Sequence, residues 1–486
     1  MIRFSKTWII ILILAVILPF WTIWIASINW EPILIYPLVT SYVAAIVIAW
    51  VAGGNKFSYM RLFFWVYVYI MFGLSALAQV SLNSWPWPGY YATVQISETY
   101  GIVWIGLVAY EIGYSLRAWN KKDSRTTATT LIPQPQNQGN PGIKQAVLCI
   151  FLAIASYGFL FSREVPIFAL RNEYSTQLLD SLGTVGHAVI LLFTQYLPLL
   201  SLLWVITEYK SHLIRQQPKL FYFLIGGILL IVLGISSNPI IAARWWFSTV
   251  FISLLLIFWG KSKKTLFLLG LTIPIAYTLL FPYLDLFRTE ETFEKVTSSS
   301  RSSFLQNFTK GDFDSLQQTM NAQVYVEYQG ITFGRQLLGV FAYWIPREVW
   351  ADKPVDTGIM VAEFLGYSFK NLSSPLWAEG LVNFGLIGVI LFLGIWGYVS
   401  ILLDKVFQSD FITSQHYPVW ILPSFYMLVP AQNLLIRGSL LITTLYISSP
   451  ILIVMGWTWI DRIIRLFTLS KYQKNLTQGS SIDSSS

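Results

Sequence analysis

The chain has 486 residues, of which 55% are hydrophobic and only 12% are charged, and its net charge at pH 7 is +8. Such an apolar composition excludes a soluble globular protein and predicts a polytopic membrane protein. A basic excess in a membrane protein is typical of cytoplasmic anchoring loops, so we expect no nucleic acid among its partners.

Apolar runs long enough to cross a bilayer recur along the whole chain. Scanning for runs of about 18 or more mainly apolar residues predicts about twelve transmembrane helices in an all-α fold. They lie near residues 8–28, 33–52, 62–82, 97–116, 145–161, 182–206, 219–237, 245–260, 265–284, 383–403, 418–435 and 440–460. The first run follows Arg3 and Lys6 and lacks a small-residue cleavage site, so we expect an uncleaved helix.

The positive charges predict the orientation of these helices. With a cytoplasmic N-terminus, most basic residues of the short connections fall on the cytoplasmic side, as the positive-inside rule requires. The C-terminus is then cytoplasmic too. Residues 117–144 read as a flexible cytoplasmic linker, and residues 461–486 as a Ser-rich tail that we expect to be disordered. The predicted organisation is thus 1–284 and 383–460 in the membrane, separated by one long connection.

That connection, residues 285–382, is predicted to be extracytoplasmic and to carry function, as unusually long loops often do. Arginine outnumbers lysine on this side, and arginine grips phosphate or carboxylate with a planar fork. Any one of these arginines can equally pair with a neighbouring acid. For the extracytoplasmic arginines taken together, we expect an anion-binding site.

The stretch GRQLLGVFAYWIPREVW (334–350), which contains Arg335, predicts an amphipathic helix lying in the membrane interface. Pro346 kinks or ends that helix, and the Lys353–Pro354 bond holds the following chain extended. The expected result is an aromatic-anchored turn that presents Arg347 and Lys353 at headgroup depth. There they would meet the diphosphate of a lipid-linked substrate. The alternative is an amphipathic helix that only seals the bundle.

Two further arginines lie at predicted membrane edges. Arg244 ends SNPIIAAR just outside a helix, and Arg437 lies in the tight turn LIRGSL between the last two helices. An arginine at such an edge is costly unless it binds an anion or lines a wet cavity. We therefore predict that Arg244, Arg335, Arg347, Lys353 and Arg437 bind the substrate diphosphate.

Glu379 opens the run WAEGLVNFGLIG with Asn383 four residues later, so both side chains can share one helix face. Apolar surroundings raise a carboxyl pKa, and Glu379 is therefore a candidate general base. Pairing with an arginine is an equal alternative.

Other signals are weaker. GDFDS (311–315) imitates an acid-x-acid metal motif, but it lies on the side where nucleotide sugars are absent. His187 is expected to be a packed histidine, and the single cysteine, Cys149, excludes an intramolecular disulfide. We expect no metal and no cofactor.

These features resemble the O-antigen polymerase family, the Wzy-type oligosaccharide repeat-unit polymerases. The resemblance is carried by WIPREVWADKP (344–354), the SNPIIAAR stretch, EGLVNFGLIG (379–388) and IRG at Arg437. It implies a GT-C-like membrane glycosyltransferase of the bacterial inner membrane. Such enzymes transfer a growing glycan from one undecaprenyl diphosphate to the non-reducing end of a new lipid-linked repeat unit, without a metal or nucleotide. It further implies catalytic roles for Arg347 and Glu379, and partners such as a chain-length regulator and a flippase.

Three alternatives remain open. An O-antigen ligase-like transferase would typically carry a histidine in its large outer loop, and 285–382 has none. A lipid-linked oligosaccharide flippase would show internal repetition and charges along a central cavity. A GT-C enzyme with monosaccharide-phosphate donors would have an acid in a sizeable first outer loop, which here is a few residues around Glu31. We predict the polymerase.

Overall fold

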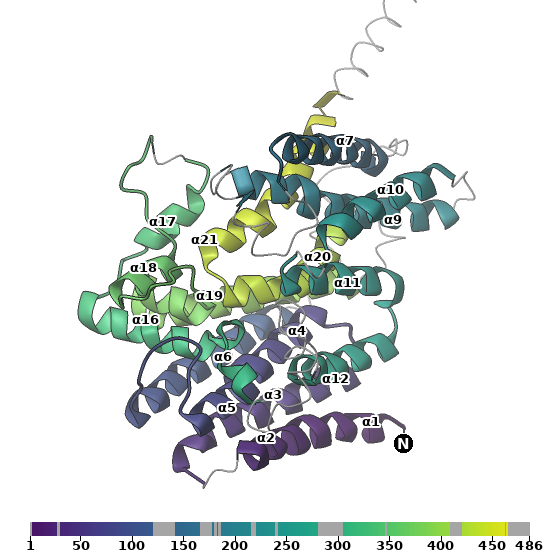
Figure 1. Cartoon of the computed structure of the whole chain (residues 1–486). Helices are drawn as coiled ribbons and strands as arrows, with labels where there is room; N and C mark the ends of the chain where they lie inside the picture. Colours follow the sequence, from purple (N-terminus) through teal and green to yellow (C-terminus); the bar gives the residue numbers. More distant parts are fainter. Residues whose placement is uncertain are drawn as a thin grey trace, which may run out of the picture.

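The computed structural model describes the chain in segments, and every regular element in them is a helix. The described residues are 2–26, 30–119, 141–165, 177–178, 182, 186–214, 220–238, 242–279, 305–345, 348–408, 420–461 and 463–464. The long helices run roughly alongside one another (Figure 1). Most of the predicted linker, the first part of 285–382 and the tail beyond 464 lie outside the described residues.

The N-terminal part of the bundle comprises α1 (Ile2–Ile11), η1 (Leu12–Ile17), α2 (Leu18–Ala26), η2 (Pro32–Leu34), α3 (Ile35–Gly53), α4 (Tyr59–Val68), η3 (Tyr69–Leu74), α5 (Ser75–Leu82) and α6 (Thr93–Trp119). The middle part comprises α7 (Pro141–Ser162), η5 (Leu192–Tyr196), α9 (Leu197–Ile214), α10 (Leu220–Ser236), α11 (Arg244–Trp259) and α12 (Lys263–Leu279). Because α6 continues to Trp119 and α7 begins at Pro141, both ends of the predicted 117–144 linker are helical.

The C-terminal part includes the long connection and the last helices. It comprises η6 (Asn307–Thr309), η7 (Gly311–Phe313), α16 (Ser315–Gln329), α17 (Arg335–Phe341), α18 (Thr357–Phe364), α19 (Leu376–Gln408), α20 (Ile421–Arg437), α21 (Leu440–Thr443) and η8 (Thr444–Ser448). Helices α16, α17 and α18 gather at one end of the long helices, at the left of Figure 1.

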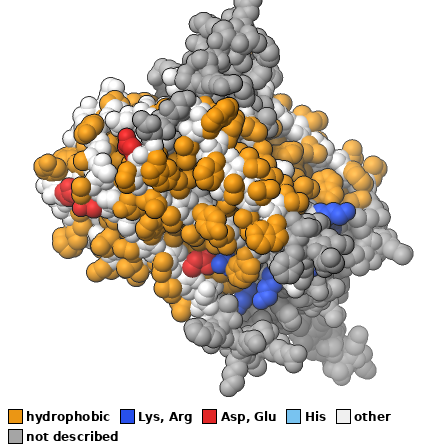
Figure 2. Space-filling model, turned by 90° about the horizontal axis from the view of Figure 1, so that it is seen from below, with side chains coloured by type: hydrophobic (Ala, Val, Ile, Leu, Met, Phe, Trp, Pro, Cys, Tyr) orange, Lys and Arg blue, Asp and Glu red, His pale blue; other side chains and the backbone are white. Residues whose placement is uncertain are grey.

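Seven helices of the described chain are long and apolar enough to cross a membrane. They are Thr7–Ile25, Pro32–Gly53, Tyr59–Leu82, Gly142–Ser162, Gly186–Lys210, Leu376–Gln408 and Leu440–Asp461, and two shorter apolar helices are Leu220–Ser236 and Trp245–Trp259. Within the described residues, the predicted ranges 97–116, 265–284 and 418–435 coincide with α6, α12 and α20. Hydrophobic side chains also cover most of the described surface in Figure 2. The prediction of an all-α fold is thus confirmed for the described residues, and these apolar helices are consistent with a membrane protein of at least seven spans.

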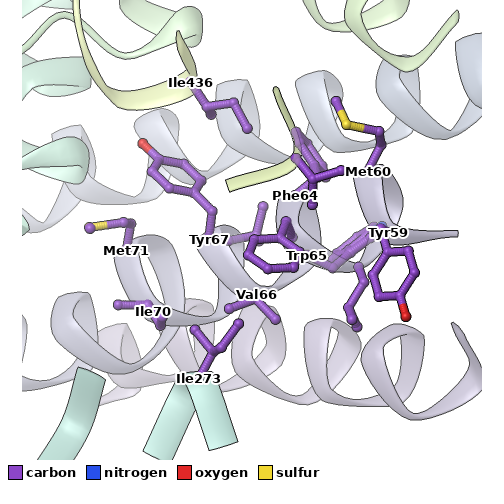
Figure 3. Close-up of a cluster of buried hydrophobic side chains, with 14 of the residues drawn as sticks. Tyr59, Met60, Phe64, Trp65, Val66, Tyr67, Ile70, Met71, Ile273 and Ile436 are labelled. Atoms are coloured by element: carbon purple, nitrogen blue, oxygen red, sulfur yellow. The ribbon is translucent and has the colours of Figure 1, made fainter. Parts of the chain in front are cut away.

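The helix Tyr59–Leu82 is the centre of the bundle, since its apolar stretch is completely buried. A helix that is hydrophobic on all sides is expected in such a position. Figure 3 shows side chains of α4 and η3, among them Phe64 and Tyr67, packed with Ile273 of α12 and Ile436 of α20. This central helix therefore links the N-terminal helices to the last ones.

Helix α19 is bent sharply near its start. Phe384 (φ −145°, ψ 19°) and Gly385 (φ 65°, ψ −149°) leave the helical region, and the positive φ at Gly385 favours glycine. The two halves approach so closely that a Cβ on Gly380 would lie 2.6 Å from the amide nitrogen of Val389. A Cβ on Gly388 would overlap the carbonyl oxygen of Gly380. The bend therefore requires small residues on both sides.

Gly388→Ala is expected to destabilise the protein by about 1–3 kcal/mol, because the added methyl group must push the halves of α19 apart. The measurement is the thermal unfolding midpoint of the detergent-purified protein. Gly456→Ala is the matched control, since a Cβ on this helical glycine meets nothing within 4 Å. The control is expected to keep or slightly raise the midpoint. Equal midpoints for both variants would contradict the close approach.

The predicted interfacial helix is shorter in the structure than in the sequence analysis, since α17 ends at Phe341. Pro346 has no amide hydrogen, so it cannot extend the helix, and it disfavours helical geometry at Ile345. The ammonium of Lys353 donates to the carbonyls of Tyr343 (2.8 Å) and Ile345 (2.9 Å). Lys353 thus binds the backbone of the two residues on either side of Trp344, while Pro346 and Arg347 of the predicted turn lie outside the described residues.

Candidate functional site

The described part of the bundle encloses a cavity of about 680 Å³. It lies between the central helix, the beginnings of the helices near 187 and 244, the ends of α12 and α20, and parts of the long connection. The lining includes Val66, Tyr67, Ile70, Met71, Trp87, His187, Leu191, Gln195, Tyr196, Ala242, Ala243, Trp245, Trp246, Tyr277, Lys310, Gly311, Asp312, Asp314, Phe369, Asn371, Leu372, Ser373, Asn433, Leu434, Arg437, Gly438, Ser439, Ile442 and Tyr446.

Irregular helical turns border this cavity. Ile70 and Met71 come from η3, Tyr196 from η5 and Tyr446 from η8, and each of these three segments is a π-helical turn inside a longer apolar helix. Single π turns within α-helices occur frequently at functional sites. The helices change their geometry where they meet the cavity.

Aromatic rings form one wall of the cavity. Tyr196 stacks on Tyr446 with ring centroids 5.3 Å apart and meets Trp246 edge to face at 4.6 Å. Trp245 lies 5.9 Å from Trp246. Such a wall is apolar and rigid, which suits a hydrocarbon chain.

Arg437 is the cation at the end of α20, and its side chain keeps 28% of its surface exposed. Its Nη2 donates to the carbonyl oxygen of Gly311 (2.7 Å) and to Oδ1 of Asp314 (3.1 Å). Its Nε is buried and is among the described polar atoms that have no hydrogen-bond partner. One edge of the guanidinium is therefore held by the protein, while the exposed part of the same side chain lines the cavity.

Asp314 connects Arg437 to the rest of the cavity rim. This carboxylate is 1% exposed and also accepts from Nε1 of Trp87 (3.0 Å) and Oγ of Ser373 (2.7 Å). The segment around it is anchored on α5, because Nε2 of Gln79 donates to the carbonyls of Phe308 and Phe313. With three donors and little water, Asp314 fixes the arginine in place.

The other predicted diphosphate ligands differ in position. Arg244 is the first residue of α11, next to the cavity residues Ala243 and Trp245, but its side chain is not described. Arg347 lies outside the described residues. Arg335 is exposed and donates to the carbonyl of Asp352 (3.4 Å). Neither Arg335 nor Lys353 is among the residues that line the cavity.

Glu379 lies behind the cavity instead of in it. Its side chain is 1% exposed, and it accepts from Oγ1 of Thr357 (2.8 Å) and from the backbone amide of Leu440 (3.0 Å). The neighbouring Asp356 is 4% exposed and accepts from the amide of Gly358 (2.9 Å) and from the Ser439 hydroxyl.

We call Asp356 and Glu379 the carboxyl pair. Both hold residues 439–440, directly after Gly438 and Arg437, so the pair fixes the corner between α20 and α21. Burial raises the pKa of Asp356 above its usual range, because the charged form loses water. The carboxyl pair thus positions the corner between α20 and α21, which carries Arg437 and which we call the arginine corner, although neither carboxyl group lines the cavity.

Two features that the sequence analysis set aside belong to the cavity. Gly311, Asp312 and Asp314 of GDFDS line it, as does His187. The sequence does contain one sign of this: GDFDS and His187 lie on the same predicted outer side of the membrane as Arg437. Among the described residues, no group of three or more His, Cys, Asp or Glu side chains could hold a metal ion.

No protein-family model, no curated protein and no solved structure matches this chain. The cavity combines a fixed, partly exposed arginine with polar groups and an aromatic wall. That combination suits an amphipathic anion.

Proposed function

We propose that the chain is an oligosaccharide repeat-unit polymerase. In this proposal it joins undecaprenyl-diphosphate-linked glycans at the extracytoplasmic face of the bacterial inner membrane. The observation that carries the proposal is Arg437 in a cavity of the apolar helical bundle, beside the aromatic wall of Tyr196, Trp246 and Tyr446. A polyprenyl diphosphate needs both an arginine donor and an apolar groove.

The reaction would proceed as a displacement at the anomeric carbon of the donor glycan. The acceptor hydroxyl oxygen forms the new bond to that carbon, and the bond to the diphosphate oxygen breaks. The leaving diphosphate takes the electron pair, and Arg437 stabilises the charge that develops on it. The hydroxyl proton passes to a base, for which the cavity offers His187 or Asp312. Glu379 instead supports the arginine corner.

The proposal includes the topology expected from the sequence. About twelve helices would cross the membrane, both termini would be cytoplasmic, and 285–382 would face outward. This long connection contributes eight residues of the cavity lining: Lys310, Gly311, Asp312, Asp314, Phe369, Asn371, Leu372 and Ser373. The growing polymer would then leave on the outer side, where a chain-length regulator can reach it.

Deletion of the gene in its host tests the function. We expect cells that retain glycan of a single repeat unit on its final acceptor, seen as loss of the ladder on a gel. Lipid-linked units that accumulate on the cytoplasmic face would indicate a flippase instead. Intact long polymer that stays on undecaprenyl diphosphate would indicate a ligase. Unchanged polymer on its usual acceptor would contradict the proposal.

A further inference from the structure

Two aromatic side chains stack on each other at the rim of the cavity. Trp87, from the connection between α5 and α6, and Phe369, from the connection after α18, have ring centroids 5.3 Å apart and planes within 10°. Both line the cavity. Phe369 is 50% exposed, so one large ring is available to a ligand. We call these two residues the aromatic pair.

Polar side chains surround the aromatic pair. Asn371 and Ser373 follow Phe369 in the chain, and Lys310 and Asp312 approach from the segment before α16; all four line the cavity. A pyranose ring has a face of C–H groups and a rim of hydroxyls. It is therefore bound by a flat ring together with planar amides, carboxylates and other polar groups at its edge. The rim of the cavity offers this combination.

The aromatic pair is joined to the arginine site by hydrogen bonds. Asp314 accepts from Nε1 of Trp87 at 3.0 Å and from Nη2 of Arg437 at 3.1 Å, so it lies between them. Tyr446 of the aromatic wall follows Arg437 in the chain and lines the same cavity. The cavity thus combines an aromatic and polar rim, a cation that shares Asp314 with this rim, and an apolar wall. A lipid-linked glycan combines a sugar, a diphosphate and a hydrocarbon chain.

Aromatic residues near a membrane surface often serve only as interfacial anchors. Two observations argue against that role for the aromatic pair. The indole N–H of Trp87 points inward to the buried Asp314, whereas an anchor directs it to headgroups and water. Phe369 covers Trp87 and also lines the cavity. By contrast, Trp344 is 69% exposed, does not line the cavity and fits the anchor role.

We propose that the aromatic pair is a glycan-binding platform. It takes the sugar nearest to the diphosphate by stacking against Phe369, while Asn371 and Asp312 bind its hydroxyls. This inference rests on the proposed function, because it names the glycan end of the same substrate.

The test compares Phe369→Leu with Phe369→Tyr in detergent-purified protein. Leucine keeps an apolar side chain but removes the flat ring, and tyrosine keeps the ring. Two probes are titrated by intrinsic fluorescence: the host's repeat-unit oligosaccharide, released from its lipid by mild acid, and undecaprenyl diphosphate without sugar. We expect Phe369→Leu to weaken oligosaccharide binding by about tenfold and Phe369→Tyr to retain it. Binding of undecaprenyl diphosphate is expected to stay unchanged, as is all binding by the control Trp344→Ala.

Each other result overturns the platform. Unchanged oligosaccharide binding by Phe369→Leu would show that the ring is not used, and equal weakening of both probes would indicate a general structural effect. Wild-type protein that binds undecaprenyl diphosphate but no oligosaccharide would remove the platform and leave the polymerase proposal standing. Protein that binds neither probe would also remove the platform, and the deletion experiment would then decide separately on the polymerase.

Discussion

Arg437→Ala is expected to reduce polymer formation by about 10²–10³-fold and to leave single repeat units, because the leaving diphosphate loses a fixed donor. The effect should appear in the rate of glycan transfer at saturating substrate, measured with purified protein and lipid-linked repeat units. Arg437→Lys keeps the charge but not the planar fork, so we expect an intermediate loss.

Removing Arg437 also leaves Asp314 buried without its cation, which costs stability in its own right. The double variant Arg437→Ala with Asp314→Asn separates the two effects, because it removes both charges. It is expected to recover protein level in the membrane but not transfer activity. The matched control is Arg335→Ala, an exposed arginine that does not line the cavity. Normal chain length in the double variant would rule out a catalytic role for Arg437.

Glu379→Ala should be the most destabilising of the single substitutions considered, by about 2–6 kcal/mol. It leaves the Thr357 hydroxyl and the Leu440 amide without their acceptor, at about 1–3 kcal/mol for each buried donor. Glu379→Gln keeps an acceptor oxygen and most of the volume, so its loss should be much smaller. Chemical denaturation of the detergent-purified variants gives the comparison.

The two roles considered for Glu379 predict different results for Glu379→Gln. A positioning residue tolerates the amide and keeps a normal pH profile of transfer. A general base does not, because glutamine cannot take a proton. Loss of transfer in a stably folded Glu379→Gln protein would therefore restore the catalytic role predicted from the sequence.

Asp356 adds a pH dependence to the same corner. Its pKa in the folded protein is raised by burial, so in the unfolded chain it ionises first, near the usual value of about 3.9. Stability should therefore fall as the pH rises from about 4 through the raised pKa, and should level off above it. The measurement is the difference in unfolding midpoint between wild type and Asp356→Asn across that range. A constant difference would contradict the raised pKa.

The fold could largely be predicted from the sequence, because lipid forces each spanning segment to be one apolar run. The run predicted at 62–82, for example, is the buried helix Tyr59–Leu82. The bend in α19 could not be predicted. It depends on contact between Gly380 and Gly388 across a left-handed Gly385, and glycine in an apolar run is also common in straight helices.

Less of the site could be predicted. Arg437 could be predicted as a site residue because a charge at a membrane edge is costly and stands out in an apolar sequence. Its partner Asp314 lies 123 residues away in the sequence, and Trp87 lies 227 residues from Asp314, so neither pairing leaves a local pattern. Glu379 was predicted as a base from its position at a helix start. The burial of Glu379 depends on its contacts with α18 and α21, and no local sequence pattern indicates these contacts.

Each of the π-helical turns in three walls of the cavity holds one residue more than a regular α-helix would. An α-helix advances by about 100° per residue, and a π turn accommodates the extra residue without shifting the helix on either side. Deleting one residue from Leu192–Tyr196 should therefore make that helix regular and leave Trp204 of α9 in the core. What such a deletion removes is the local widening beside the cavity residue Tyr196. A single-residue deletion inside the regular helix α9 should be far more damaging, because it turns every residue beyond it by about 100°.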